Sequence, residues 1–265
     1  DVTYACATAE GGVALVRSRT TTTTAAKTQG SKKQKTETKE TSVTSSVSEL
    51  ARYDGDEEAL TSIAIDRSGR KVFCASRSGH VTRLEYESST LRRLKTWQPH
   101  KSSPVLDMAI DNTGSLLCTG STDRTARVWD IERGYCTHAF RGAHGGALTA
   151  VAFHPSINAA RVYTAAEDGS LCVWSLNDKK NNGLVKSMAD AHVSAITAIR
   201  IDVESNTLLT AGRDKVVKTF ELDTLKPRTT TAVHETIEDC VILDGNSSII
   251  RETGIKAPVN GGVVF

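Results

Sequence analysis

Three sets of histidine, threonine and aspartate recur along this chain, and residues of these types can build a hydrolytic site. In such a site a hydroxyl group attacks a carbonyl carbon, an imidazole takes the hydroxyl proton, and a carboxylate orients the imidazole. Each set here also ends in an aromatic residue. The sets are His100, Thr119, Asp123 and Trp129; His144, Thr164, Asp168 and Trp174; and His192, Thr210, Asp214 and Phe220.

The recurrence of these sets argues against catalysis. An enzyme needs its catalytic set once per active site, whereas 45 residues separate Asp123 from Asp168 and 46 separate Asp168 from Asp214. The chain also lacks a nucleophile elbow, a phosphate-binding loop, a zinc-protease motif and a dinucleotide fingerprint. Buried indole, hydroxyl, imidazole and carboxylate groups can instead satisfy one another's hydrogen bonds. We therefore expect structural networks and no enzyme activity.

The segments around each aspartate predict a repeated four-stranded unit. Three of them align without gaps: Thr119-Gly-Ser-Thr-Asp123-Arg-Thr-Ala-Arg-Val-Trp129, Thr164-Ala-Ala-Glu-Asp168-Gly-Ser-Leu-Cys-Val-Trp174 and Thr210-Ala-Gly-Arg-Asp214-Lys-Val-Val-Lys-Thr-Phe220. An alternating apolar strand precedes each segment, at residues 105–110, 148–153 and 196–201. A period of about 45 residues with this order of strands and turns is typical of a β-propeller blade.

Less regular copies flank these three. Residues 60–65 and 71–75 give the first two strands of another repeat, with Ser78 at the aspartate turn and Leu84 in the tryptophan position. We expect an all-β propeller with four full blades in residues 49–236 and partial blades in residues 1–17 and 237–265. Because propellers usually close with four to eight blades, we expect a fragment of a larger ring.

Residues 18–48 interrupt the repeats. Sixteen of these 31 residues are Ser or Thr, and no apolar periodicity runs through them. Such composition predicts a disordered insertion. The segment carries six basic and two acidic residues, a net charge of +4, whereas the 27 basic and 29 acidic residues of the remainder give −2. Residues 31–35, Ser-Lys-Lys-Gln-Lys, can be read as a weak nuclear signal, as a tether for RNA or as a plain flexible loop.

Composition excludes several other classes. The net charge of +2, from 33 basic and 31 acidic residues, gives no whole-chain field that would favour nucleic acid or a membrane. No apolar run is long enough to span a bilayer, and the first residues do not resemble a signal peptide. The six cysteines lie far apart and form no Cys-x-x-Cys pair, so we expect buried reduced thiols without zinc or disulfides. We expect no metal, no cofactor and no small-molecule substrate, in a soluble intracellular protein.

Val128-Trp129-Asp130, Val173-Trp174-Ser175, the aspartate turns and the histidine loops resemble WD40 repeats over nearly the whole chain. Four stretches are similar to a narrower group, the nucleolar WD40 subunits of the UTP-B complex in the small-subunit processome. They are Tyr135-Cys-Thr-His138-Ala-Phe140-Arg141-Gly142, Val151-Ala-Phe-His-Pro155, Gly212-Arg213-Asp214-Lys215 and Val233-His-Glu235-Thr-Ile-Glu238.

This resemblance implies a non-catalytic, nucleolar scaffold in ribosome biogenesis that supports processing of pre-rRNA to small-subunit rRNA. Its implied partners are other WD40 propeller subunits of UTP-B, with peripheral or indirect contact to pre-rRNA and the U-three small nucleolar RNA. The alternative is a generic WD40 adaptor, such as a ubiquitin-ligase substrate receptor or a signalling scaffold. The sequence Trp129-Asp130-Ile131-Glu132-Arg133 counts against such a receptor, because its Arg comes one residue too late for a Trp-Asp-x-Arg motif.

A propeller fold does not itself say which surface binds a partner. Basic residues beside the aspartate turns are expected on one face, where they could hold phosphates or an acidic peptide. The other interpretation is that they are solvated loop charges. The candidate contacts are Arg77, His80, Arg124, Arg213 and Lys215.

Overall fold

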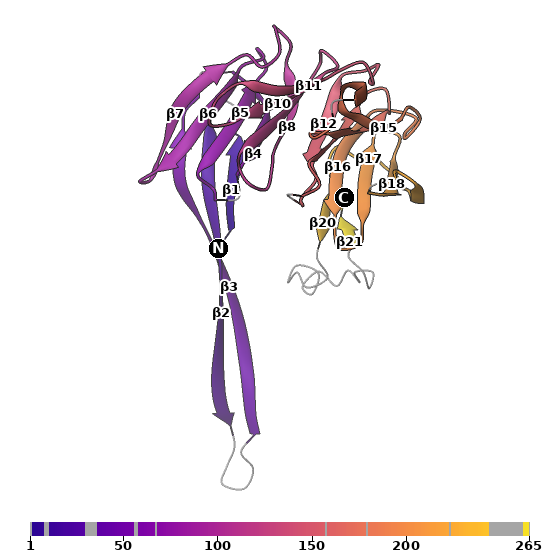
Figure 1. The fold of residues 1–265 in the computed structure, drawn as a ribbon. Helices are drawn as coiled ribbons and strands as arrows, with labels where there is room; N and C mark the ends of the chain where they lie inside the picture. Colours follow the sequence, from indigo (N-terminus) through magenta and orange to yellow (C-terminus); the bar gives the residue numbers. More distant parts are fainter. Residues whose placement is uncertain are drawn as a thin grey trace.

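The computed structural model describes residues 2–7, 11–29, 36–55, 58–66, 68–156, 158–178, 180–222, 224–243 and 262–264. Within these ranges the chain is built of strands, with one short 3-10 turn, η1 (Lys180–Gly183). The strands form four four-stranded antiparallel sheets, flanked by a three-stranded sheet at the N-terminal side and a two-stranded sheet at the C-terminal side (Figure 1). The expected all-β architecture with four full blades is confirmed.

The four full blades follow one another along the chain. Blade 1 contains β4 (Leu60–Ile65), β5 (Lys71–Ser76), β6 (Val81–Glu87) and β7 (Thr90–Trp97). Blade 2 contains β8 (Val105–Ile110), β9 (Leu116–Ser121), β10 (Ala126–Asp130) and β11 (Cys136–Phe140). Blade 3 contains β12 (Leu148–Phe153), β13 (Arg161–Ala166), β14 (Leu171–Ser175) and β15 (Leu184–Met188). Blade 4 contains β16 (Ile196–Asp202), β17 (Thr207–Gly212), β18 (Val216–Glu221) and β19 (Pro227–Ala232).

Burial within a blade follows the position of the strand. The second strands are covered on both faces by neighbouring blades, and the last five residues of β9, β13 and β17 are buried in each case. The outermost strand β19 is exposed along its whole length. It begins with Pro227, a residue that edge strands accept because it brings no backbone N–H that needs a partner.

The hydrophobic core is divided into clusters that lie between consecutive sheets. One cluster joins blade 2 to blade 3 through Phe140 and Trp174, and another joins blade 3 to blade 4 through Tyr163 and Phe220. Since each blade buries its apolar faces against its neighbours, the arrangement of the blades depends on these clusters more than on any single sheet.

Side chains on the innermost strands also bond one blade to the next. Three threonine hydroxyls donate to carbonyl oxygens that come after their own blade: Thr61 to Val105 at 2.5 Å, Thr149 to Ile196, and Thr197 to Ile237, in the segment that follows blade 4, at 2.7 Å. In blade 2 Asp107 has the same role as these threonines: its carboxylate accepts a hydrogen bond from the Val151 backbone N–H at 2.9 Å. These bonds hold the inner strands in register from blade 1 to the segment after blade 4.

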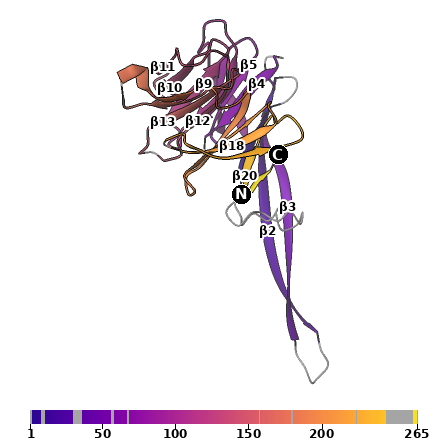
Figure 2. The same cartoon turned by 90° about the vertical axis from the view of Figure 1, so that its right-hand side faces the viewer.

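The N-terminal sheet contains β1 (Val2–Ala7), β2 (Val13–Gln29) and β3 (Thr36–Tyr53). β2 and β3 pair from Val13 and Tyr53 to Gln29 and Thr36, as a hairpin that extends well beyond the blades (Figure 2). The structure thus differs from the disordered insertion expected at residues 18–48. Threonine is β-branched and favours extended backbone, so a Thr-rich segment can pair as strands without an apolar pattern.

The boundaries of the partial blades shift accordingly. Residues 50–53 pair with β2 in the N-terminal sheet, so the four full blades begin at Leu60 and not at residue 49. At the other end β20 (Val241–Leu243) pairs with β21 (Gly262–Val264). Residues 31–35, which carry the candidate nuclear signal or RNA tether, lie outside the described ranges, as do residues 244–261 and 265 of the last expected partial blade.

All six cysteines are free thiols. Cys74, Cys118, Cys172 and Cys240 are buried as expected, and burial raises the pKa of each of the last three. The expectation of burial was wrong for Cys6, which is exposed, and for Cys136, which is half-buried. Cys6 lies on β1 at an edge of the N-terminal sheet, where only one neighbouring strand covers it.

Candidate functional site: repeated polar networks and the turn face

The most complete polar network lies in blade 3. The Trp174 indole N–H donates to the Thr164 hydroxyl over 2.8 Å, and the same hydroxyl lies 2.6 Å from His144 Nε2. His144 Nδ1 lies 2.6 Å from the Ser170 hydroxyl, which donates to Asp168 Oδ1 at 2.5 Å. The network therefore runs from the third strand of the blade through the second strand to the loop that precedes the blade.

The donor and acceptor properties of these groups fix its direction. An indole N–H can only donate, so the Thr164 oxygen accepts from Trp174 and its own proton is free for His144 Nε2. Because Nε2 accepts, the His144 proton is on Nδ1, which donates a hydrogen bond to the Ser170 hydroxyl. That hydroxyl in turn donates to Asp168. Every polar side-chain group of this blade 3 network has a partner, as a buried network requires.

Electrostatics favour the neutral form of this histidine. Burial lowers the pKa of His144 to about 4, and the nearby Asp168 carboxylate opposes this only weakly. Burial would raise the pKa of Asp168, but the Ser170 and Gly145 hydrogen bonds outweigh it and the pKa is lowered. At neutral pH the network therefore holds an uncharged imidazole and a carboxylate.

Blade 2 repeats the network with a direct contact between the histidine and the aspartate. His100 Nδ1 lies 2.9 Å from Asp123 Oδ2, and His100 Nε2 lies 2.9 Å from the Thr119 hydroxyl, which accepts the Trp129 indole N–H at 3.2 Å. Partial burial acts to raise the pKa of Asp123, but the hydrogen bonds from His100 and Thr125 prevail and lower it to about 2. Asp123 therefore stays ionised over the whole physiological range.

Blade 4 keeps every member of the network except the indole N–H. His192 Nδ1 lies 2.9 Å from Asp214 Oδ2 and His192 Nε2 lies 2.7 Å from the Thr210 hydroxyl. The aromatic slot is filled by Phe220, which is 1% exposed but has no N–H to donate. Desolvation lowers the pKa of His192 despite its contact with Asp214.

The structure brings the members of each set together, and it shows one connection that sequence reasoning missed. His144 reaches Asp168 through Ser170 and not directly. Thr125 occupies the same place in blade 2, two residues after the aspartate, and donates to Asp123 at 2.7 Å. A hydroxyl residue two positions after the aspartate was the signal that could have revealed this relay.

The geometry does not suit nucleophilic catalysis. Thr119, Thr164 and Thr210 each have no exposed surface, so their hydroxyls cannot meet a substrate in this conformation. Each hydroxyl is also held by the histidine beside it. These arrangements connect strands within the blade, which is the structural role expected from their recurrence.

The corresponding positions in blade 1 carry different residues. Gly55, Cys74 and Leu84 replace the histidine, threonine and tryptophan, one period of 45 residues before His100, Thr119 and Trp129. Ser78, in the aspartate position, donates to Glu58 at 2.6 Å and lies 2.8 Å from His80 Nδ1. Blade 1 therefore lacks the buried network of the other blades and keeps only an exposed polar cluster.

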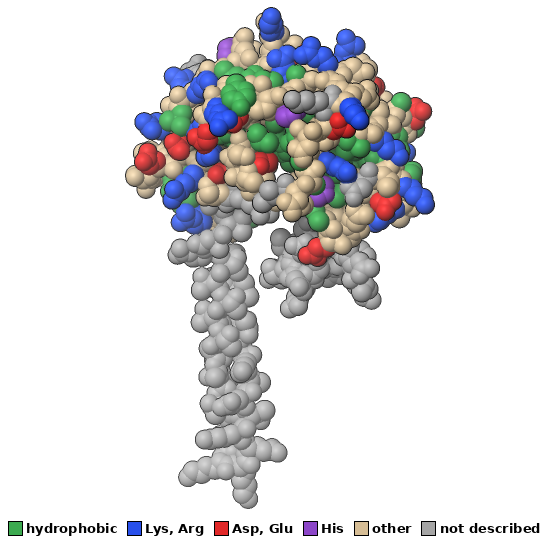
Figure 3. All heavy atoms as spheres, viewed as in Figure 1, with side chains coloured by type: hydrophobic (Ala, Val, Ile, Leu, Met, Phe, Trp, Pro, Cys, Tyr) green, Lys and Arg blue, Asp and Glu red, His purple; other side chains and the backbone are tan. Residues whose placement is uncertain are grey.

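The five candidate contact residues lie in turns between the second and third strands of blades 1, 2 and 4, at the end of the blades where the histidine loops are. Arg77, Arg124, Arg213 and Lys215 are exposed and His80 is half-buried. Arg213 forms an ion pair of 3.3 Å with Glu238. Glu167 takes the place of Arg213 in blade 3, so the basic residues form no unbroken stripe. Acidic and basic side chains are likewise mixed over the face seen in Figure 3.

The described residues provide neither a cluster of metal ligands nor a membrane-spanning helix. No group of three or more His, Cys, Asp or Glu side chains in this part of the chain is placed to hold a metal ion. The same residues contain no helix with the length and apolar character needed to cross a bilayer.

Known proteins with this repeat define the class of the chain. The WD domain, G-beta repeat family model matches residues 91–130, 134–175 and 184–221. Each match starts at or next to the outer strand of one blade and ends in the third strand of the next, so a sequence repeat spans two blades. The solved WD40 β-propeller domain of Doa1 superposes with a TM-score of 0.63 over 89% of this chain and 67% of that chain, at 16% identity. The chain is a WD40-repeat β-propeller protein.

Its curated relatives are longer. The chain is 33% identical over 202 residues to Transducin beta-like protein 3 of Bos taurus, covering 76% of this chain and 24% of the relative. It is 28% identical over 209 residues to U3 small nucleolar RNA-associated protein 13 of Saccharomyces cerevisiae, covering 75% of this chain and 25% of the relative. The matched part thus spans about a quarter of the length of each.

Proposed function

We propose that this chain is part of a non-catalytic scaffold in ribosome biogenesis, a structural subunit of the UTP-B complex of the small-subunit processome. In this role it supports processing of pre-rRNA to small-subunit rRNA in the nucleolus. Its partners are other WD40 propeller subunits, with peripheral or indirect contact to pre-rRNA and the U-three small nucleolar RNA.

The observation that carries this proposal is the similarity, over three quarters of the chain, to Transducin beta-like protein 3 and to a yeast protein named for its association with U3 small nucleolar RNA. The site geometry supports a scaffold. The His, Thr and Asp sets that could resemble a hydrolase are buried and bonded within each blade, so the surface turns are left to make contacts.

The proposed contacts on the turn face are Arg77, His80, Arg124, Arg213 and Lys215. Guanidinium and ammonium groups on exposed turns can pair with carboxylates or phosphates without a backbone rearrangement. Because Glu167 interrupts them, we favour contacts with acidic segments of neighbouring subunits over a continuous track of RNA phosphates.

Affinity purification of the full-length tagged protein from nuclear extract, with mass spectrometry of proteins and sequencing of bound RNA, tests the proposal. We expect tandem-propeller subunits together with pre-ribosomal and U-three RNA. Recovery of cullin-ligase or signalling components instead would support the generic adaptor and contradict the processome assignment.

A pair of variants tests the turn face in the same experiment. Arg124→Glu combined with Lys215→Glu reverses two charges there and should reduce recovery of the partner subunits several-fold. Arg92→Glu, on the exposed outer strand of blade 1, is the control and should leave recovery unchanged. Equal recovery of the partner subunits with both variants would show that the turn face does not contact them.

A further inference from the structure

A small pocket lies where blade 1 meets blade 2, away from the turn face. Its volume is about 80 Å³, and its wall includes Arg83 on β6, Lys95 and Trp97 on β7, and Trp129 on β10. The turn between β10 and β11, with Arg133, closes one side. Pockets for drug-sized ligands are roughly 300–1,000 Å³, so this one has room for a single side chain.

Two buried N–H groups in this pocket have no acceptor. Arg83 Nε and Trp97 Nε1 are both inaccessible to solvent and make no hydrogen bond in the described part of the chain. Guanidinium and indole N–H groups can only donate. Because buried donors without partners are unfavourable and uncommon, the pocket is suited to a group that accepts hydrogen bonds.

Positive charge surrounds these donors. The Lys95 ammonium lies 5.9 Å from the centre of the Trp97 ring, which places it over the aromatic wall. It also lies 2.7 Å from the position that a Cβ on Gly134 would take, so it reaches from blade 1 to the β10–β11 turn of blade 2. Arg133, in the same turn, is exposed.

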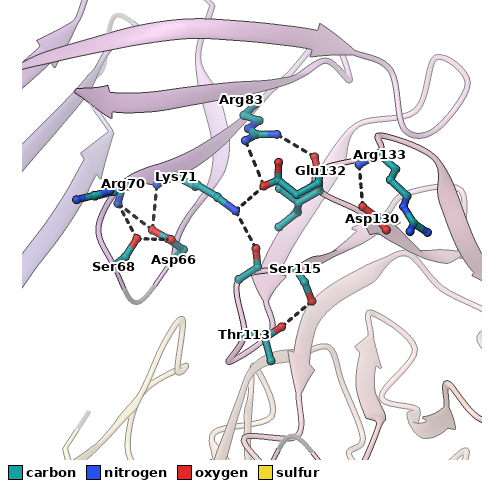
Figure 4. Close-up of polar contacts among 12 residues, drawn as sticks. Asp66, Ser68, Arg70, Lys71, Arg83, Thr113, Ser115, Asp130, Glu132 and Arg133 are labelled. Atoms are coloured by element: carbon teal, nitrogen blue, oxygen red, sulfur yellow. Dashed lines mark hydrogen bonds and ion pairs between the residues drawn. The ribbon is translucent and has the colours of Figure 1, made fainter.

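The acidic residues beside the pocket are already engaged. Lys71 and Arg83 converge on Glu132, at 2.6 and 3.5 Å (Figure 4). Asp130 Oδ1 accepts the backbone N–H of Arg133 at 2.8 Å. The Arg133 guanidinium donates to the neutral Tyr135 hydroxyl at 3.4 Å. No ion pair joins Lys95 or Arg133 to an acid among the residues that the structure describes, so the charges of both cations remain available to an incoming anion.

The neighbouring interface shows that the propeller does not require these residues. Arg83 pairs across its sheet with Phe73 as Val128 pairs with Cys118 and Val173 with Tyr163, so the three positions correspond. Val128 and Val173 are both completely buried apolar residues. A guanidinium in place of a core valine brings a desolvation cost that packing alone does not explain.

The outer strands β7 and β11 also carry different residues at corresponding positions. By the same register, Lys95 corresponds to His138 and Trp97 to Phe140. Between blades 2 and 3, Phe140 stacks on the buried Trp174 with ring centres 4.8 Å apart. Between blades 1 and 2 the matching rings, Trp97 and Trp129, meet edge to face at 6.2 Å and are only half-buried.

We propose that this pocket binds the carboxylate side chain of an acidic segment of a partner protein, with an apolar neighbour of that side chain packed on the Trp97 and Trp129 rings. The unpaired donors and the free cations match a carboxylate. A chain of RNA phosphates fits less well, because the pocket of about 80 Å³ has room for a single side chain. This inference does not depend on the assignment to ribosome biogenesis.

The test measures, by fluorescence anisotropy, how tightly the full-length protein binds a fluorescein-labelled peptide of alternating Glu and Leu. A peptide with Gln in place of Glu is the ligand control, and labelled oligouridine is the RNA probe. The protein variants Arg83→Val, Lys95→His and Trp97→Phe introduce the residues that blade 2 carries at the same positions, so each suits the fold. Circular dichroism melting verifies that they remain folded.

We expect Arg83→Val and Lys95→His each to weaken binding of the Glu peptide by about tenfold, the loss of one charge-assisted contact. Trp97→Phe, which keeps a ring but removes the N–H, should weaken it several-fold. Lys186→His changes the exposed lysine that corresponds to Lys95 in blade 3 and should have no effect. Equal affinity for the Gln peptide, equal loss in Lys186→His, or tighter Lys95-dependent binding of oligouridine would overturn the proposal.

Discussion

The interface between blades 2 and 3 and the interface between blades 1 and 2 use the same strand positions for different purposes. In the first, Trp174 is 1% exposed, stacks on Phe140 and donates to Thr164. In the second, Trp129 is half-buried beside Arg83, and buried donors remain without acceptors. A repeat fold can thus hold one interface closed for stability and leave another polar, where a partner can bind.

The largest expected effect concerns the two tryptophans. Trp174→Ala should lower the free energy of unfolding by about 4 kcal/mol, because it removes a buried ring and leaves Thr164 and Phe140 around a cavity. Trp129→Ala should cost roughly half as much, since its ring is partly solvated. Urea denaturation of both variants provides the comparison. Equal losses would mean that the two interfaces are equally closed.

The pH dependence of stability tests the neutral histidine. The pKa of His144 is lowered to about 4 in the folded state from 6.5, so the unfolded chain binds more protons between these values. The contribution of His144 to stability should therefore fall by roughly 3 kcal/mol as the pH drops from 6.5 to 4, with His192 acting in the same direction. Asp107, whose pKa burial raises to about 6, opposes this trend. Denaturant midpoints from pH 4 to 7 should fall less toward low pH in His144→Gln than in the parent protein, and the same pH dependence in both would contradict the assignment.

The threonine hydroxyls should differ between blades. Thr164→Val leaves both Trp174 Nε1 and His144 Nε2 without a partner, which should cost about 2 kcal/mol. Thr210→Val should cost less, because Phe220 has no N–H and only His192 loses a partner. Thermal melting of the two variants measures the difference. A larger loss for Thr210→Val would show that the indole bond contributes little.

Arg83→Val should make the interface between blades 1 and 2 more like the apolar interface between blades 2 and 3. Valine is the residue of blades 2 and 3 at this position, and replacing a buried polar group by an apolar one can be neutral or stabilising. We expect the unfolding free energy to stay equal or rise by about 1 kcal/mol, while binding of the acidic peptide weakens about tenfold. A loss above about 2 kcal/mol would show that Arg83 is needed for stability.

The smallest expected effect concerns the hairpin. Replacing residues 22–43 by a short turn should change the unfolding free energy by less than about 0.5 kcal/mol, because the cluster between the N-terminal sheet and blade 1 uses Val13, Leu15, Ala51 and Tyr53 instead. Differential scanning calorimetry is sufficient for this test. A larger loss would mean that the hairpin itself contributes to the stability of the N-terminal sheet.

The repeat was predictable because its signal is local. The spacing of Asp123, Asp168 and Asp214 gave the blades, and the aromatic positions gave the third strand of each. The pocket was not recognised, because it depends on which side of a strand faces the next blade. Even so, Arg83 lies 45 residues before Val128, and that alignment could have revealed a charge in a core position. The hairpin was missed because Thr-rich composition fits both disorder and extended strands.

Depletion of the full-length protein from cells, followed by measurement of pre-rRNA species, tests the central claim most directly. The account predicts that precursors of small-subunit rRNA accumulate while large-subunit rRNA matures normally, and that the re-expressed protein reverses the defect. Normal small-subunit maturation after complete depletion would contradict a role in the processome.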